Sequence, residues 1–201
     1  MTGTWDSERD PLVALRGGDP APFEAFVVAE SSTFLAFFRR LGASSGEAED
    51  LVQEVFLKLF RHADTYEPSG RFRAFAFRIA RNAWIDRRRR LASAPRVAAR
   101  GEDASGEEAE EPLAREVASL PGPALIAERR EEAGRVGAAL GQLSEGHRLV
   151  FELGVVQELS YQEIARILEI PEGTVKSRMF HAVRKLRALL EEEPRRGRAQ
   201  A

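Results

Sequence analysis

Hydrophobic residues recur at intervals of three and four through two long stretches of the chain, which is the spacing of helices with one buried face. The first stretch covers residues 10–91 and the second covers residues 125–190. Val, Ile and Thr do not form the alternating runs that strands require. The pattern therefore predicts an all-α protein made of two small helical domains.

The first stretch predicts three or four helices. One runs from Phe23 to Leu41 and ends at Gly42. The next begins near Ser44, a residue type that caps helix N-termini, and runs to about Ala63. Its predicted buried stripe is Leu51, Val52, Val55, Phe56 and Leu59.

A third helix is predicted from about Phe72 to Leu91, after a turn at Pro68-Ser69-Gly70. It interleaves aromatic and basic side chains, a combination that suits single-stranded nucleic acid because rings stack on bases and Arg neutralises phosphate. Asn82 carries an amide that can read a base edge. The simpler interpretation, equally weighted at this point, is a core face of Phe72, Phe75 or Ala76, Ile79, Ala83 and Asp86 beside a solvated arginine face.

Residues 92–124 separate the two helical stretches and differ from both in composition. They are rich in Ala, Glu, Gly, Ser and Pro and have few large apolar side chains. Such a segment cannot bury enough surface to offset its chain entropy, so we expect a flexible acidic linker.

The second stretch contains a helix-turn-helix pattern, in which the second helix enters the DNA major groove. Ser160 followed by Glu163 forms a capping box, and the helix that it opens is predicted to run from Tyr161 to Leu168. Glu169-Ile170 is the turn, and Pro171 starts the next helix. The buried stripe predicted for that helix is Val175, Met179, Ala182, Val183, Leu186 and Leu190. An ordinary amphipathic hairpin is the less favoured alternative.

The formal net charge of -2 conceals strong segregation along the chain. Residues 71–100 sum to +9, residues 101–117 to -6 and residues 171–201 to +4. Basic segments of this kind point to a polyanionic partner. Nearly all of the basic residues are Arg, the better bidentate ligand of phosphate; the alternative explanation for this preference over Lys is a genome with GC-rich codons.

Composition also excludes several classes of protein. The chain has no cysteine and only three scattered histidines, so we expect no disulfide, thiol nucleophile, metal site or cofactor. No apolar run approaches the roughly 20 residues that cross a bilayer, and the N-terminus lacks the pattern of a signal peptide. We therefore expect a cytoplasmic protein without direct membrane insertion.

Three segments together resemble the sigma-70 family, specifically the small extracytoplasmic-function (ECF) type of bacterial sigma factor. They are residues 50–60, residues 72–90, and residues 143–148 taken with 159–189. The resemblance implies a region 2-like domain at 10–91, a linker at 92–124 and a region 4-like helix-turn-helix domain at 125–190. It also implies a promoter-specificity subunit without catalysis of its own.

The resemblance assigns partners and contact residues. The implied partners are core RNA polymerase, through the clamp helices of its largest subunit and its flap region, promoter DNA both single-stranded and duplex, and an anti-sigma factor. Contact with core polymerase falls to Asp50, Gln53, Glu54 and Phe60. Contact with the minus-ten element falls to Phe75, Arg78, Arg81, Asn82, Arg87 and Arg88. Contact with the minus-thirty-five element falls to Arg166, Thr174, Lys176, Ser177, Phe180, His181 and Arg184.

Two other functions are weighed against this one. A stand-alone helix-turn-helix repressor would bind a palindrome as a symmetric dimer, but residues 10–91 suggest no ligand pocket and a flexible linker disfavours a rigid dimer. An enzyme acting on nucleic acid would need a catalytic constellation. Carboxylates are plentiful, but none is grouped with His or with a phosphate-binding glycine loop.

Overall fold

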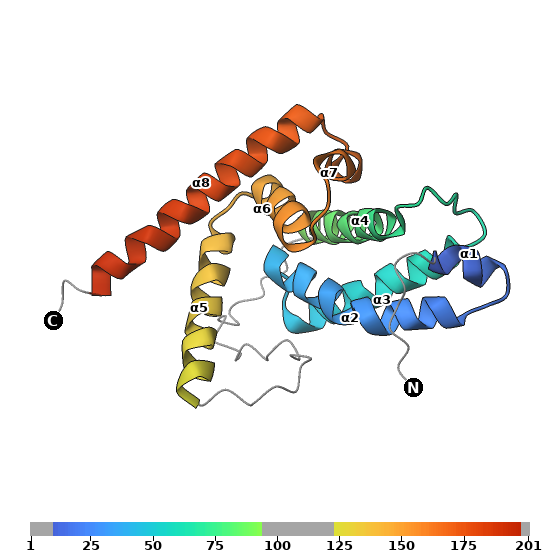
Figure 1. The fold of residues 1–201 in the computed structure, drawn as a ribbon, viewed down its shortest axis with the longest axis horizontal. Coiled ribbons are helices and arrows are strands. Elements are labelled where there is room, and N and C mark those ends of the chain that lie inside the picture. Colours follow the sequence, from blue (N-terminus) through green and yellow to red (C-terminus); the bar gives the residue numbers. More distant parts are fainter. Residues whose placement is uncertain (1–9, 94–122, 198–201) are drawn as a thin grey trace.

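The computed structural model describes residues 10–93 and 123–197, and every regular element among them is helical (Figure 1). The prediction of an all-α protein is therefore confirmed for the described part of the chain. The predicted linker lies almost wholly at residues 94–122, outside the described residues.

The first group of helices is built around phenylalanine. It comprises α1 (Pro11–Arg16), α2 (Ala21–Leu41), α3 (Ser45–Arg61) and α4 (Phe72–Ser93). Phe26 and Phe34 of α2 are fully buried, and their rings meet Phe72 and Phe77 of α4 at centroid distances of 4.8 Å and 5.0 Å. The buried face of α3 lies on the same core, as predicted, with Phe56 only half-buried.

Local signals in the sequence set the ends of these helices. The N-terminus of α1 is capped by Asp10, whose carboxylate accepts from the backbone N–H of Leu12 at 3.0 Å. Ser44 and Glu47 form a reciprocal capping box at the start of α3. Gly42 ends α2 with φ 103°, a left-handed conformation that glycine adopts without steric cost.

The second group follows at residues 123–197. It comprises α5 (Pro123–Gly141), α6 (Glu145–Phe151), the π-helical turn η1 (Glu152–Val156), α7 (Tyr161–Leu168) and α8 (Glu172–Gly197). The bounds of α7 are those predicted. The α7–α8 turn depends on Glu169, whose φ of 56° places a non-glycine residue in the left-handed region.

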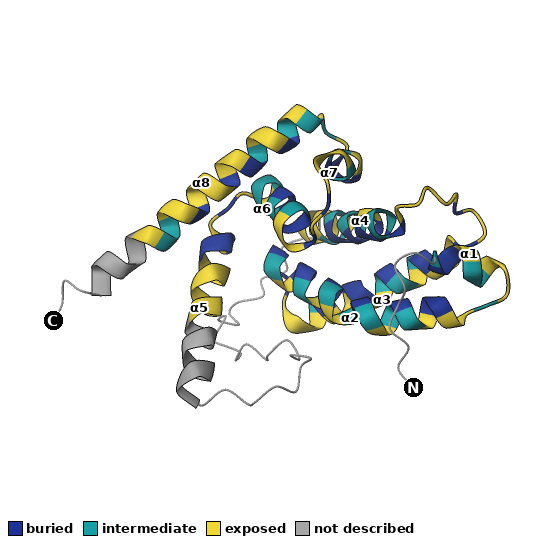
Figure 2. Cartoon of the chain, in the orientation of Figure 1, coloured by how far each residue is buried: buried dark blue, intermediate teal, exposed yellow. Residues whose placement is uncertain are grey.

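The two groups pack against each other. Helix α7 lies along α4, and α2 contacts both α5 and α6 (Figure 1). Apolar residues of α6, η1, α7 and α8 join α2, α3 and α4 in one continuous cluster of buried side chains. Figure 2 shows the consequence for α4, which has buried and half-buried positions around most of its circumference.

This packing corrects two predicted core positions. Asp86 of α4 is exposed, because the buried positions at this end of the helix are Ala83 and Trp84. Val183 of α8 is also exposed, because Ala182 and Leu186 form the buried stripe there.

Contrary to the expectation from the sequence, helix α2 is long and apolar enough to span a bilayer by length and mean hydropathy alone, at 1.2 over its most apolar window. Eight of its residues are nonetheless buried within the protein, five of them phenylalanines. We therefore interpret α2 as a core helix.

Replacing Gly42 tests how α2 ends. Gly42→Ala should lower the free energy of unfolding by about 1–2 kcal/mol, because a Cβ is strained in the left-handed region. Gly46→Ala is the matched control: Gly46 lies in the first turn of α3 with open space around it, so it should be neutral or slightly stabilising. Urea denaturation measures both, and equal effects would contradict the assignment.

Candidate nucleic-acid and protein interfaces

Helix α3 presents a polar stripe with an apolar end. Asp50 and Gln53 are exposed, and the ring of Phe60 at the end of the stripe is 53% exposed. Glu54 is half-buried, since one of its carboxylate oxygens lies 2.6 Å from Lys58 Nζ and the other 3.6 Å from Arg90 Nη2. The structure thus places the four residues predicted to contact core polymerase on one helix, with Glu54 already engaged within the chain.

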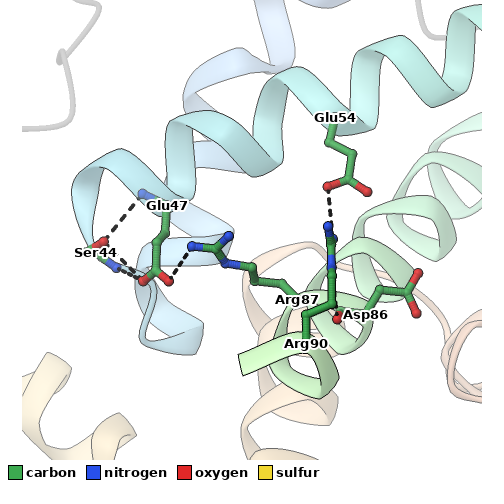
Figure 3. Close-up of polar contacts among 6 residues, drawn as sticks. All are labelled: Ser44, Glu47, Glu54, Asp86, Arg87 and Arg90. Atoms are coloured by element: carbon green, nitrogen blue, oxygen red, sulfur yellow. Dashed lines mark hydrogen bonds and ion pairs between the residues drawn. The ribbon is translucent and has the colours of Figure 1, made fainter. Parts of the chain in front are cut away.

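A second ion pair joins the start of α3 to α4 (Figure 3). Arg87 Nη2 donates to Glu47 Oε1 at 3.0 Å, while Glu47 Oε2 accepts from the backbone N–H of Ser44 at 3.2 Å. The Ser44 N–H and then the Arg87 guanidinium hold the pKa of Glu47 below its ordinary value. Arg87, predicted to contact DNA, thus has a partner that secures α4 to α3.

The first half of α4 carries an aromatic cluster that reaches the surface. Phe75 is half-buried, with its ring centroid 4.8 Å from Tyr66, and the guanidinium of Arg78 lies 5.2 Å from its centroid. The Tyr66 hydroxyl donates to Asp10 Oδ2 at 2.7 Å, and burial together with this carboxylate raises the pKa of Tyr66. These contacts fix the Phe75 ring beside an exposed arginine.

A groove of about 640 Å³ runs beside this cluster, between α4 and α7. Phe75, Arg78 and Asn82 line it from α4, and Glu163 and Arg166 line it from α7. The structure therefore brings the predicted minus-ten residues together with Arg166, which was assigned to the minus-thirty-five element.

The second half of α4 is more engaged within the chain than predicted. Arg81 donates to Asn82 Oδ1 at 3.0 Å and to the backbone oxygen of Leu168 in α7 at 3.5 Å. Both Arg81 and Asn82 are half-buried. Arg88 is exposed, and its guanidinium lies 5.6 Å from the ring centroid of Trp84.

The exposed face of α8 holds most of the residues predicted to read duplex DNA. Phe180 is 61% exposed, and Lys176 pairs with Glu172 one turn earlier at 2.9 Å. Thr174, at the start of the helix, is half-buried. The other exposed members of the predicted set are Ser177, His181 and Arg184.

Two titratable groups on the neighbouring helices α7 and α6 have lowered pKa values. The capping box of α7 lowers the pKa of Glu163, because the hydrogen bonds from Ser160 and the charges of Arg71 and Arg166 outweigh the opposing effect of burial. The rings of His147 and His181 lie 6.1 Å apart. Burial first, and then the charge of His181, lowers the pKa of His147.

Several contacts between the two groups were not predicted. Glu152 and Gln157 are buried polar residues, and Trp84 of α4 donates through Nε1 to Glu145 Oε1 of α6 at 2.9 Å. Trp84, Glu152 and Gln157 carry no sequence signal for these contacts, because their partners in the other group of helices lie far away in the chain. Among the described residues, no group of three or more His, Asp or Glu side chains is placed to hold a metal ion.

Comparisons with known proteins agree with this arrangement. The family description "Sigma-70 region 2" matches residues 26–94, and "Sigma-70, region 4" matches residues 133–186. The ECF RNA polymerase sigma factor SigL of Mycobacterium tuberculosis is 38% identical over 157 residues, covering 76% of this chain and 80% of SigL. The ECF RNA polymerase sigma-E factor of Escherichia coli is 31% identical over 169 residues, covering 82% and 84% respectively.

Solved structures of sigma factors are also similar. CnrH in complex with the cytosolic domain of CnrY matches with a TM-score of 0.63 and 26% identity, covering 93% of this chain and 99% of CnrH. The sigma factor RpoE of Bartonella quintana, in complex with the anti-sigma factor NepR, matches with a TM-score of 0.64 and 25% identity, covering 84% and 96%.

The pKa of Glu47 gives a test of the α3–α4 pair. Because the folded pKa lies below the ordinary 4.5, ionised Glu47 stabilises the fold above 4.5, and this contribution is lost as the pH falls through the folded value. Glu47→Gln should therefore be less stable than the parent chain at pH 7, with the difference shrinking at pH 4 and below. Glu49→Gln, an exposed neighbour in the same turn, is the charge-matched control. A deficit for Glu47→Gln that does not change with pH in urea denaturation would contradict the pair.

Proposed function

The chain belongs to the sigma-70 family, among its ECF sigma factors, and directs promoter-specific initiation by RNA polymerase; we propose that three helices divide this work. Members of this family are non-enzymatic transcription initiation factors, and we extend this to the present chain, acting in the cytoplasm. The observation that carries the proposal is that α3 and α8 each bury one face in the core and offer a polar or basic face, while α4, which is packed on several sides, leaves Arg78 and Arg88 exposed.

Helix α3 is the proposed contact with the clamp helices of core polymerase. Asp50 and Gln53 are free of core packing, and Phe60 adds an exposed ring at the end of the same helix. An apolar anchor beside charged groups is a common composition for a protein–protein contact. The pairing of Glu54 with Lys58 and Arg90 leaves Asp50 and Gln53 as the main polar contacts on this helix.

Helix α4 is the proposed contact with the single-stranded minus-ten element. Phe75 offers a ring for stacking, Arg78 an exposed guanidinium for phosphate, and Asn82 an amide for a base edge. Arg81 and Arg88 extend the basic surface along the helix. Arg87 is assigned mainly to holding α4 on α3, through Glu47.

Helix α8 is the proposed reader of the minus-thirty-five element in the major groove. Lys176 and Ser177 lie in its first turns, where recognition helices touch bases. Phe180 and His181 follow on the exposed face, and Arg184 and Arg166 are the phosphate contacts. We assign the polymerase flap as the protein partner of this second group of helices.

An anti-sigma factor is the proposed regulatory partner. The support is that a similar solved structure, RpoE of Bartonella quintana, is recorded with one. The stand-alone repressor is disfavoured, because the proposed minus-ten face has no role in a protein that binds only duplex DNA.

Reconstituted transcription tests the core contact and the function together. With core polymerase and promoter DNA, the parent chain should give promoter-dependent transcripts, and Asp50→Ala/Gln53→Ala should weaken binding to core at least tenfold, because fewer interface contacts remain. Asp64→Ala, exposed after the end of α3, is the control and should bind normally. Absence of promoter-dependent transcripts from the parent chain would refute the function. Loss of helicity in the double variant would contradict the placement of the two side chains outside the core.

Salt dependence tests the duplex contact. Arg184→Ala should weaken binding to duplex DNA similarly for all sequences and reduce the slope of log K against log salt by about 1, because one phosphate contact is lost. Ser177→Ala should instead alter sequence preference and leave that slope nearly unchanged. Fluorescence anisotropy over a salt series measures both, and an unchanged slope for Arg184→Ala would remove it from the phosphate contacts.

A further inference from the structure

Two histidines lie next to each other where the start of α6 meets α8. The ring centroids of His147 in α6 and His181 in α8 are 6.1 Å apart. Arg178, about one turn before His181 on α8, lies against Gly146, where an added Cβ would be 3.2 Å from Arg178 Nη1. The absence of a side chain at Gly146 therefore lets a guanidinium lie directly beside the first turn of α6.

A lysine adds a further cation at the same place. Lys185, about one turn after His181 on α8, donates through Nζ to the backbone oxygen of Gln142, just before α6. Side chains three and four positions apart lie on one side of a helix, so the three residues of α8 all lie beside α6. We call these four side chains the α6–α8 cluster: His147, Arg178, His181 and Lys185.

The α6–α8 cluster has no negative partner. Within the described ranges of the chain, no ion pair joins any of its members to a carboxylate. The neighbouring charged residues of α6 have other contacts: Glu145 accepts from Trp84 Nε1, and Arg148 donates to the backbone oxygen of Leu41. Burial first, and then the charges of the three members on α8, hold the pKa of His147 below 6.5. Cations that repel one another at one place form a site that an anion would stabilise.

The His147 ring has one nitrogen available for such an anion. Ser144 Oγ lies 3.0 Å from Nδ1, while Nε2 has no hydrogen-bond partner among the described residues. A protonated imidazole donates through both nitrogens, so Nε2 can donate to an anion while Ser144 accepts from Nδ1. Because a hydrogen bond spans about 3 Å, one tetrahedral oxyanion can reach both His147 and His181.

The position of the cluster indicates which anion it meets. Its α8 members lie beside Ser177 and Phe180, which belong to the face proposed to read duplex DNA. A helix in the major groove is flanked by the two phosphate backbones, so cations just off the reading face meet phosphate. Arg is a strong bidentate ligand of that group.

We propose that the α6–α8 cluster binds a backbone phosphate of duplex DNA, and that its two histidines take up protons when the phosphate binds. The inference rests on the proposed role of α8 as the reader of the minus-thirty-five element. It adds His147, Arg178 and Lys185 to the residues that contact this DNA.

Proton uptake gives the binding a pH dependence of defined sign. In the free chain, the neighbouring cations and burial disfavour the protonated form of His147. A bound phosphate favours that form, so the complex holds more protons than the free chain does. Affinity for DNA therefore rises as the pH falls through the range in which histidine titrates.

The first measurement is binding of the full chain to a fluorescent DNA duplex of mixed sequence at constant low salt. For the parent chain, affinity should rise about tenfold as the pH falls from about 7.5 to about 6. His147→Gln should lose most of this rise. His147→Lys keeps a positive charge throughout, so it should bind at the higher pH as tightly as the parent does at the lower one. A role of the ring in packing alone would not produce that result.

His62→Gln is the matched control. His62 is an exposed histidine at the end of α3, outside the proposed duplex-reading surface. This variant removes the same titratable group and should keep the full rise in affinity of the parent chain.

The second measurement tests the site without DNA, by NMR of the histidine rings. The chain has three histidines, so the rings are assigned from the His147→Gln and His62→Gln variants. Sulfate is a tetrahedral anion that does not titrate in this pH range, and it replaces chloride at constant pH and ionic strength. It should move the His147 ring resonances towards their protonated positions and leave those of His62 unchanged.

Each outcome bears on a different part of the proposal. If His147→Gln keeps the pH dependence of the parent chain, or if sulfate leaves the His147 resonances unchanged, the site is overturned. A sulfate response combined with a DNA affinity that does not depend on pH would overturn the assignment to DNA phosphate. A parent chain that binds no duplex at either pH would refute the proposed role of α8, while the sulfate response would still decide whether the cluster binds an oxyanion.

Discussion

The contact on which the rest of the structure depends is the packing of α4 against the phenylalanines of α2. Phe26, Phe34 and Phe37 meet Phe72 and Phe77 in a cluster of rings at centroid distances of 4.8 to 5.4 Å. Aromatic rings bury large areas and pack in tilted and edge-to-face arrangements, so this cluster fixes the rotation of α4 about its axis. That rotation decides which side chains of α4 can reach DNA and which face α7.

The same helix therefore serves two partners. Its apolar face stabilises the first group of helices. Its polar face is partly covered by α7, and the exposed remainder is the proposed contact with DNA. The Glu47–Arg87 and Glu54–Arg90 pairs join α4 to α3 on yet another side (Figure 3), so the proposed polymerase contact and the proposed DNA contact lie on adjoining helices.

Much of this architecture could be predicted because its signals are local. Gly42, the Ser44 cap, the Ser160–Glu163 capping box and the periodic stripe of α3 are read from residues within one or two turns, and the structure agrees with them, apart from Phe56, which is only half-buried. Asp86 and Val183 were placed wrongly because a helix contacted on several sides does not have one apolar stripe. The ion pair between Arg40 and Glu152 could not be predicted, since the two residues are 112 positions apart and neither belongs to a recognisable motif.

The structure separates the arginines of α4 into two sets. Arg81 and Arg87 were predicted to contact DNA, yet both of them, like Arg73, have partners within the chain. Arg78 and Arg88 remain exposed beside aromatic rings. The arginines of α4 therefore divide into those that bind other residues of the chain and those whose exposed guanidinium groups can bind a polyanion.

The most direct test of this account is hydroxyl-radical footprinting of two side chains, with and without core RNA polymerase. In the free chain Phe60 of α3 is 53% exposed and Trp84 of α4 is 5% exposed, with its indole N–H bound to Glu145. Adding core polymerase should protect Phe60, since α3 is the proposed contact with polymerase, while buried Trp84 serves as the unreactive reference in the free chain. Unchanged reactivity of Phe60 would contradict the account.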